Sequence, residues 1–364
     1  MSLNYEYEKQ LVKHRPGSYH FYVIFFIILL IIIGLRYEVG GDWPPYRWYY
    51  ERAGTVSFIE YIALNEIGYA LINLLSYHLS AGISFVNLCC ALIFIIGLYK
   101  FALSLPRPWL GFVVASPYLI VVIAMGFSRQ GVAIALTMYA IKFIKEGKNY
   151  LYALFIIFAC LFHVSAILLL PLVLLQFIRK NILFFFLGLG FVFITIFYYY
   201  DTLYNKAFDY ISLEIISNGT HIRLLMNLLP ACIFIFFINK FNITKNEKLF
   251  WLQMSFLAFI FLGMNFIFPG STIIDRLGFY LISLQMFVYS YLPGVFGNYK
   301  KKNKFWVLMV IFLYFSTLFV WLNFANHNYA WLPYKSFLIE SDLYGYDGML
   351  VQECIFDHSC QFKW

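Results

Sequence analysis

The sequence predicts an all-α, polytopic integral membrane protein with about 11 transmembrane helices, forming a single transmembrane domain over residues 1–364. Hydrophobic residues make up 62% of the chain and charged residues 12%, about half the charged fraction of a typical soluble protein. Apolar runs recur along the chain, each near the roughly 20 residues that cross a bilayer core. Because these runs are continuously apolar and do not alternate with polar residues, they predict helices rather than the strands of a barrel.

The apolar runs give the positions of the predicted spans. The run from His20 to Leu35 is followed by Arg36 and not by a small-residue cleavage site, so it predicts an uncleaved first helix. His163 interrupts residues 150–178, and basic residues flank both ends, so the chain must cross an even number of times there. The predicted spans are residues 20–35, 82–101, 109–126, 131–145, 150–162, 164–178, 182–199, 222–238, 249–268, 277–293 and 305–322.

The charges predict the orientation of these spans. With a cytoplasmic N-terminus, one side receives 17 of the 26 Lys and Arg residues but only 4 of the 18 Asp and Glu residues. Fourteen of those 17 are Lys, whereas six of the nine basic residues on the other side are Arg. The positive-inside rule therefore accounts for most of the net charge of +8, and no nucleic-acid partner is needed to explain it.

Two segments are predicted to lie outside the membrane on the extracytoplasmic side. Residues 36–80 form a loop, in which residues 66–80 are moderately apolar but short. A full crossing there would invert the charge pattern of every later loop, so we expect a short helix on or in the outer leaflet. Residues 323–364 are polar and aromatic and predict an extracytoplasmic C-terminal tail.

Three arginines at predicted outer helix ends are candidate anion ligands: Arg36, Arg129 and Arg276. A guanidinium offers a planar fork for phosphate and tolerates partial burial better than an ammonium. The alternative is that they pair with outside acids or lipid headgroups. Ser128-Arg129-Gln130 opens a predicted helix, whose free N–H groups would assist Arg129 in holding an anion; the alternative is a helix cap with a snorkelling arginine.

Asp42 and His163 are the candidates for proton transfer. Asp42 lies in a Gly- and Pro-rich loop, where it could act as a general base, hold a sugar hydroxyl, or simply cap a turn. His163 lies at a predicted hairpin tip, where it could accept a proton or cap a backbone carbonyl. The two flanking spans are too short to cross the core fully, so we expect His163 in a cavity recessed from the outer face.

Several familiar motifs are absent from the sequence. It contains no HExxH, CxxC, P-loop or GxGxxG motif, and no DxD pair for a metal-bound sugar nucleotide. We therefore expect no metal site and no cofactor.

Three stretches together resemble the EpsG family of Wzy-type polysaccharide polymerases. The first is Arg36-Tyr37 with Gly40, Asp42 and Tyr46. The second is Ser128-Arg129-Gln130 with Ala133, followed by Phe162-His163-x-Ser165-Ala166. The third is Asp275-Arg276-x3-Tyr280. Each stretch is short, and their order and spacing on the outer face give the match its strength.

The resemblance implies a metal-independent glycosyltransferase of the bacterial cytoplasmic (inner) membrane. Such an enzyme joins undecaprenyl-pyrophosphate-linked oligosaccharide repeat units on the extracytoplasmic face, for an O-antigen, a capsule or an exopolysaccharide. Membrane lipid, a chain-length regulator and a flippase would be its other partners. The resemblance carries over as substrate-binding residues Arg36, Tyr46, Arg129, Gln130, Arg276 and Tyr280.

The resemblance does not settle which group is the base. We expect Asp42 to be the general base and His163 to orient the acceptor or the pyrophosphate, with the reverse assignment open. An O-antigen ligase-like glycosyltransferase would share the donor and the arginine chemistry. A lipid-linked glycan flippase would place its charges along a mid-membrane path, and a membrane acyltransferase could use His163 but would not need the arginines.

Overall fold

The computed structural model describes residues 16–173, 219–267, 271–297 and 300–339, with a few positions of residues 183–197. In these ranges the chain is helical, and an isolated β-bridge joins Arg36 to Ser336. The helices that coincide with predicted spans are α2 (Pro16–Gly34), α6 (Gly82–Ser104), α7 (Pro108–Ala115), α8 (Ser128–Lys145), α9 (Asn149–Cys160), α13 (Thr220–Phe237), α14 (Lys245–Ile267), α16 (Ile282–Phe296) and α17 (Lys300–Phe324). The all-helical prediction is confirmed for the described residues.

Five described helical stretches are long and apolar enough to cross a membrane: Gly82–Ser104, Thr220–Lys240, Lys245–Ile267, Thr272–Phe296 and Asn303–Phe324. Shorter apolar helices cover His20–Gly34, Pro108–Ala124, Asn149–Cys160 and Val164–Val173. These are the helices of a membrane protein. The predicted span 182–199 lies largely outside the described residues, so the number of crossings stays a prediction.

Two predicted spans are not regular α-helices. The span 109–126 passes from α7 into a π-helix, η1 (Ser116–Ala124), and the span after His163 begins as the 3₁₀-helix η2 (Val164–Leu169). Pro117 lies in the first turn of η1, where a proline is tolerated, and the π-helix widens the backbone there. Both irregular helices pack residues against the core, η1 more completely than η2, and irregular backbone at membrane depth is tolerated where it is covered by protein.

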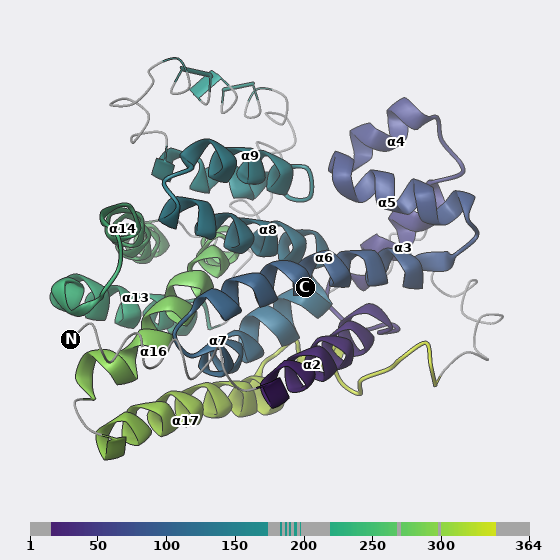
Figure 1. The fold of residues 1–364 in the computed structure, drawn as a ribbon. Helices are drawn as coiled ribbons and strands as arrows, with labels where there is room; N and C mark the ends of the chain where they lie inside the picture. Colours follow the sequence, from purple (N-terminus) through teal and green to yellow (C-terminus); the bar gives the residue numbers. More distant parts are fainter. Residues whose placement is uncertain are drawn as a thin grey trace.

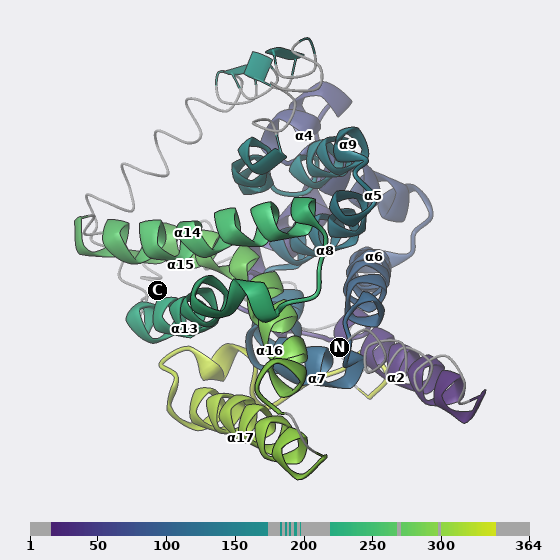
Figure 2. The ribbon, with the colours of Figure 1, turned by 60° about the vertical axis from the view of Figure 1, so that its left-hand side comes forward.

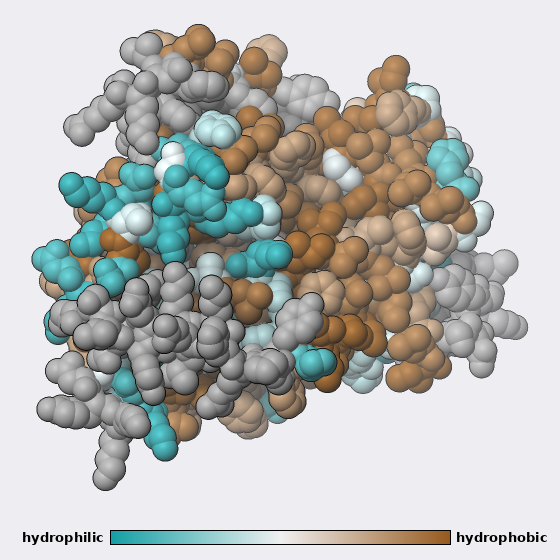
Figure 3. All heavy atoms as spheres, viewed as in Figure 1, coloured by the Kyte–Doolittle hydropathy of each residue, from teal (hydrophilic) through white to brown (hydrophobic). Residues whose placement is uncertain are grey.

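The described helices begin or end at two opposite ends of the bundle (Figure 1). At one, which we call the lysine end, α8 and α13 finish and α9 and α14 begin; it carries Lys142, Lys145, Lys148, Lys240 and Lys245. At the other, α2 and α17 finish and α8 begins, and the chain after α17 packs against the chain after α2. In Figure 3 hydrophilic surface gathers on the left, and apolar surface covers much of the centre.

Helices α6 and α8 pack closely because a glycine faces the contact. An ideal Cβ placed on Gly97 would lie 2.3 Å from the carbonyl oxygen of Ala135 and 2.9 Å from its Cβ. Small residues at such contacts let helix backbones approach in a membrane, where dispersion replaces the hydrophobic effect. The α6–α8 contact therefore depends on this glycine.

We expect Gly97→Val to destabilise the protein by about 1–3 kcal/mol or more, because the added carbons overlap backbone that cannot move aside. Thermal melting of the purified protein, followed by size-exclusion fluorescence, measures the effect. Gly263→Ala in α14 is the matched control, since nothing lies within 4 Å of its added Cβ. Equal melting temperatures for Gly97→Val and wild type would contradict this account of the contact.

Three short helices form a lobe at the upper right of Figure 1, and they lie behind α8 and α9 in Figure 2. The lobe consists of α3 (Trp43–Arg52), α4 (Phe58–Leu64) and α5 (Ile67–His78). Helix α5 confirms the helix predicted within residues 66–80, whereas α3 and α4 were not predicted. The lobe exposes the apolar side chains Phe58, Ile59, Leu71, Leu75 and Leu79. An outer-leaflet position for α5 stays a prediction.

The first part of the predicted C-terminal tail is built into the fold. Residues 325–339, which we call the strap, run beside the loop that follows α2. Tyr37 N–H donates to the carbonyl of Lys335 at 3.0 Å, and Gly40 N–H donates to that of Ala330 at 2.7 Å. The indole of Trp331 donates to the carbonyl of Val121 in η1. The strap therefore fixes the loop that carries Asp42; residues 340–364 lie outside the described part of the chain.

Candidate active site

Asp42 is held at the start of α3 by the backbone around it. Its N–H donates to the carbonyl of Gly126 at 3.2 Å, and Gly40, at φ +109°, packs its backbone directly against Met125 and Gly126. A side chain at position 40 would meet the carbonyl of Met125, which explains the glycine. The Tyr46 hydroxyl donates to the Asp42 carboxylate at 3.4 Å. The loop therefore presents one carboxylate from a fixed backbone.

Arg129, in the first turn of α8, lies in a cage of three tyrosines. Its guanidinium carbon is 5.5, 5.2 and 5.7 Å from the ring centres of Tyr46, Tyr49 and Tyr69. Its terminal nitrogen forms an ion pair of 2.6 Å with Glu66, the residue that precedes α5. The cage is built from the lobe, so Arg129 joins the lobe to the bundle and is largely committed to groups of the protein.

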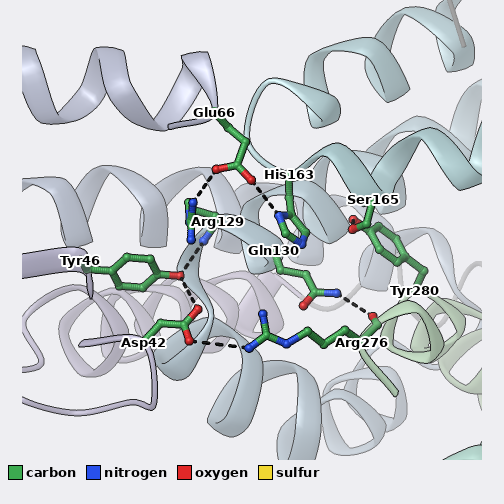
Figure 4. A network of polar contacts seen from close by, with 9 residues as sticks. All are labelled: Asp42, Tyr46, Glu66, Arg129, Gln130, His163, Ser165, Arg276 and Tyr280. Atoms are coloured by element: carbon green, nitrogen blue, oxygen red, sulfur yellow. Dashed lines mark hydrogen bonds and ion pairs between the residues drawn. The ribbon is translucent and has the colours of Figure 1, made fainter. Parts of the chain in front are cut away.

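Glu66 also contacts His163. The second carboxylate oxygen of Glu66 lies 3.1 Å from Nδ1 of His163, at the junction of α9 and η2. The extended backbone of His163 separates the two helices and turns its side chain toward the lobe. One buried carboxylate thus bridges the arginine and the histidine (Figure 4).

Burial and charge act in opposite directions on this pair. Burial alone would raise the pKa of Glu66, but Arg129 and His163 hold it well below its ordinary value. Burial lowers the pKa of His163 below its ordinary value of 6.5, against the opposing effect of Glu66, and the charges of Arg129 and Arg276 lower it further. At neutral pH Glu66 is therefore ionised and His163 is a neutral imidazole.

Arg276 reaches the same network from helix α15 (Ser271–Gly278). Its guanidinium lies 3.7 Å from the Asp42 carboxylate and 4.7 Å above the ring of Phe127. Gln130 donates to the backbone carbonyl of Arg276 at 2.6 Å and so anchors its main chain to α8. Of the charged groups in the network, Arg276 has the most exposed side chain, at 31%, and is the best placed to meet a ligand.

The remaining predicted residues, Tyr280 and Arg36, are buried next to the network. Tyr280 is buried, and its hydroxyl lies 3.0 Å from that of Ser165. Arg36 is also buried, donating to the Ser128 hydroxyl at the start of α8 and to the carbonyl of Ile33. Since Tyr46, Gln130, Tyr280 and Arg36 are each 2% exposed or less, they shape the site without presenting much surface to a substrate.

The structure thus brings seven of the eight predicted site residues into one neighbourhood (Figure 4). The eighth, Arg36, is linked to it through Ser128, the residue before Arg129. The seven come from the loop after α2 and the first turn of α3, the start of α8, the junction of α9 with η2, and the α15–η4 (Phe279–Leu281) turn. Two cavities among the described residues, one beside Trp109 and one beside Arg223, are not lined by Asp42, His163 or Arg276. The recessed cavity expected around His163 therefore stays a prediction.

Glu66 is the functional candidate that the sequence analysis missed. It was included only as the first residue of the moderately apolar segment 66–80. The available signal was its isolation: residues 61–76 contain no other acidic or basic side chain. A single carboxylate in such a segment needs a buried partner, but the sequence did not reveal that Arg129 and His163 are those partners.

A second buried ion pair lies beside the network. Arg223 of α13 forms two contacts with Asp275, at 2.6 and 2.8 Å, and its guanidinium lies over Tyr118 of η1. Asp275 immediately precedes Arg276, so this pair ties the start of the α15 segment to α13. It fixes the backbone from which Arg276 extends.

Comparison with models of known protein families shows that residues 19–336 match the EpsG family. The match spans the loop of Asp42, the start of α8, His163, Arg276 and most of the strap. No curated protein and no solved structure matches the chain.

Proposed function

Because this chain belongs to the EpsG family, the family of Wzy-type polysaccharide polymerases, we propose that it joins lipid-pyrophosphate-linked oligosaccharide repeat units into a polymer. The lipid would be undecaprenyl pyrophosphate, and the reaction would take place on the extracytoplasmic face. The observation that carries the proposal is the convergence of Arg276, Asp42 and His163 in one partly exposed network. Cations, a carboxylate and an imidazole together are what such a transfer needs.

The chemistry assigns a role to each kind of group. The acceptor hydroxyl oxygen attacks the anomeric carbon of the donor, a glycosidic C–O bond forms, and the bond from that carbon to the pyrophosphate oxygen breaks. The leaving pyrophosphate keeps the electron pair, and Arg276 neutralises its growing charge. In the free protein an Asp42 carboxylate oxygen lies 3.7 Å from a terminal nitrogen of Arg276. This contact is longer than a hydrogen bond, so a phosphate oxygen can displace the carboxylate.

Two groups are placed to take the proton of the acceptor hydroxyl. Asp42 is a carboxylate on a fixed loop, and His163 is a neutral imidazole at neutral pH. Arg129 supports the site mainly through Glu66 and its tyrosine cage, and its contribution to phosphate binding would be at longer range. We propose no metal in any step, and we expect polymerisation by the purified protein to continue in EDTA.

We propose that the lysine end faces the cytoplasm and the network end faces outward, with the N-terminus cytoplasmic. Basic loops are retained on the cytoplasmic side. In a variant with all native cysteines replaced by serine, we expect new cysteines at Lys145 and Lys245 to be shielded from a membrane-impermeant thiol reagent in intact cells. Cysteines at Glu51 and Tyr334 should react. Labelling of the Lys245 site from outside would contradict the orientation.

Deleting the gene and separating the surface glycan by electrophoresis distinguishes the candidate functions. A polymerase predicts glycans that carry a single repeat unit, with the longer ladder restored by the wild-type gene. Complete loss of attached glycan indicates a ligase-like glycosyltransferase or a flippase instead. An unaltered ladder contradicts all three functions.

A further inference from the structure

We propose that Glu66 is a positioning residue that holds His163 as the general base, with the imidazole Nε2 atom receiving the proton of the acceptor hydroxyl. The inference rests on the proposed glycosyl transfer and assigns the proton acceptor that the sequence left open. It reverses the roles suggested by the sequence, in which Asp42 was the base and His163 the orienting group.

The direction of one hydrogen bond fixes which ring nitrogen of His163 carries the proton. An ionised carboxylate has only acceptor atoms, so the 3.1 Å contact with Glu66 requires a proton on Nδ1 of His163. A neutral imidazole carries one proton, and Nε2 is then left as the unprotonated acceptor. The same division of labour, with a carboxylate fixing the tautomer of a histidine base, occurs in serine proteases.

The position of the free ring nitrogen determines which groups the base faces. Figure 4 shows the second nitrogen of His163 turned away from Glu66, toward the side of the network where Gln130 and Arg276 lie. His163 is also close enough to Arg276 for the guanidinium charge to act on it. A base on this side faces the cation that would hold the leaving pyrophosphate.

Glu66 itself is more buried than His163. Its side chain is 8% exposed, against 19% for His163, so Glu66 is shielded from substrate while His163 remains reachable. Its other oxygen is fixed by Arg129 at 2.6 Å, and Arg129 is fixed by the tyrosine cage. The carboxylate cannot rotate away from His163 without losing a buried ion pair, so the imidazole is oriented before substrate arrives.

Asp42 fits a different role. Its carboxylate contacts Arg276 and Tyr46, so it is placed to position the cation. It would keep Arg276 extended toward the site in the free protein. Asp42 then affects donor binding more than proton transfer.

The test uses the purified full chain and does not depend on activity. Diethyl pyrocarbonate acylates the unprotonated nitrogen of imidazole, and peptide mass spectrometry gives its rate at His163 as a function of pH. We expect reaction at His163 with a midpoint below the ordinary histidine value of about 6.5. In Glu66→Gln the midpoint should move to lower pH, because the negative charge that favours the imidazolium is gone.

Two further variants keep the test decisive. Glu66→Asp retains the charge on a shorter side chain, and its midpoint should lie between those of wild type and Glu66→Gln. Glu247→Gln removes another buried carboxylate, at the lysine end, where it accepts a hydrogen bond from the Thr244 N–H. It should leave the His163 midpoint unchanged. A midpoint that does not respond to either Glu66 variant, or no acylation of His163 at any pH, overturns the proposal.

The activity measurement separates this inference from the proposed function. If the wild-type protein polymerises, Glu66→Gln should lower kcat with little change in KM, and the acidic limb of the kcat profile should move to lower pH with the acylation midpoint. If the acidic limb of the kcat profile of Glu66→Gln lies at the same pH as that of the wild type, the proposal is overturned. If the wild type makes no polymer while the midpoint still shifts, the proposed function fails and the Glu66–His163 pair stands.

Discussion

Replacing Arg276 by lysine should reduce polymerisation on the order of 10²-fold, although the positive charge is kept. Loss of one group that stabilises transition-state charge typically costs that much or more. The guanidinium carbon lies 4.7 Å from the ring centre of Phe127, and a terminal nitrogen lies 3.7 Å from the Asp42 carboxylate. An ammonium can neither stack in the same way nor offer two parallel donors to a pyrophosphate. The initial rate of polymer formation from a lipid-linked repeat unit is the quantity to measure.

Arg47→Lys is the matched control for this substitution. Arg47 lies at the same end of the molecule, in α3, and pairs with the exposed Glu51. A lysine there keeps the ion pair, so the rate should match the wild type. If Arg276→Lys is normally expressed and equally active, Arg276 is a packing or topology residue and does not bind the leaving group.

Replacing His163 by alanine should reduce kcat by about 10² to 10⁴-fold, the usual cost of removing a general base. More substrate should not rescue it, because binding is not what is lost. Asp42→Asn should instead raise KM for the donor while retaining much of kcat, because Arg276 loses the group that holds it. Steady-state kinetics of the two variants in reconstituted membranes separates these effects. An inactive Asp42→Asn at every substrate concentration, beside an active His163→Ala, would assign the base to Asp42.

The pH dependence of the wild type follows from the same assignment. The His163 pKa is depressed, so the imidazole stays neutral below the ordinary value of 6.5 and the rate should fall only at lower pH. The ion pairs of Glu66 also make the free energy of unfolding fall as the pH is lowered. Its pKa is depressed, so the pairs stabilise the fold above the ordinary carboxylate pKa, and acidification removes that stabilisation.

Local sequence patterns predicted the helices because few backbone structures other than helices are stable in lipid. Continuous apolar runs must satisfy their own backbone, so they become helices wherever they occur. For the same reason the predicted helix within residues 66–80 is present as α5. Helix α3 was missed because its sequence is polar and has two prolines in its first turn, and α4 because it has only 7 residues. Such short helices depend on tertiary contacts, such as the hydrogen bond from Tyr61 to the carbonyl of Tyr49.

The site could be predicted only in part, because it depends on contacts between residues that are far apart in the sequence. The residues that carry the family pattern, such as Asp42, Arg129 and Arg276, were identifiable as ionisable groups at helix ends. Their partners were not: Glu66 meets Arg129 and His163 across separations of 63 and 97 residues, and Trp331 meets Val121 across 210. Such pairings depend on how the helices pack, and a single sequence does not encode that packing in any local pattern.

The most direct test of the central claim is a reconstituted polymerisation assay. Purified protein in lipid nanodiscs is given the organism's undecaprenyl-pyrophosphate-linked repeat unit, with EDTA present, and the products are separated by length. The account predicts a ladder of multiples of the repeat unit with release of undecaprenyl pyrophosphate, and no ladder from His163→Ala. If His163→Ala and Arg276→Lys both give the wild-type ladder, the network described here is not the catalytic site.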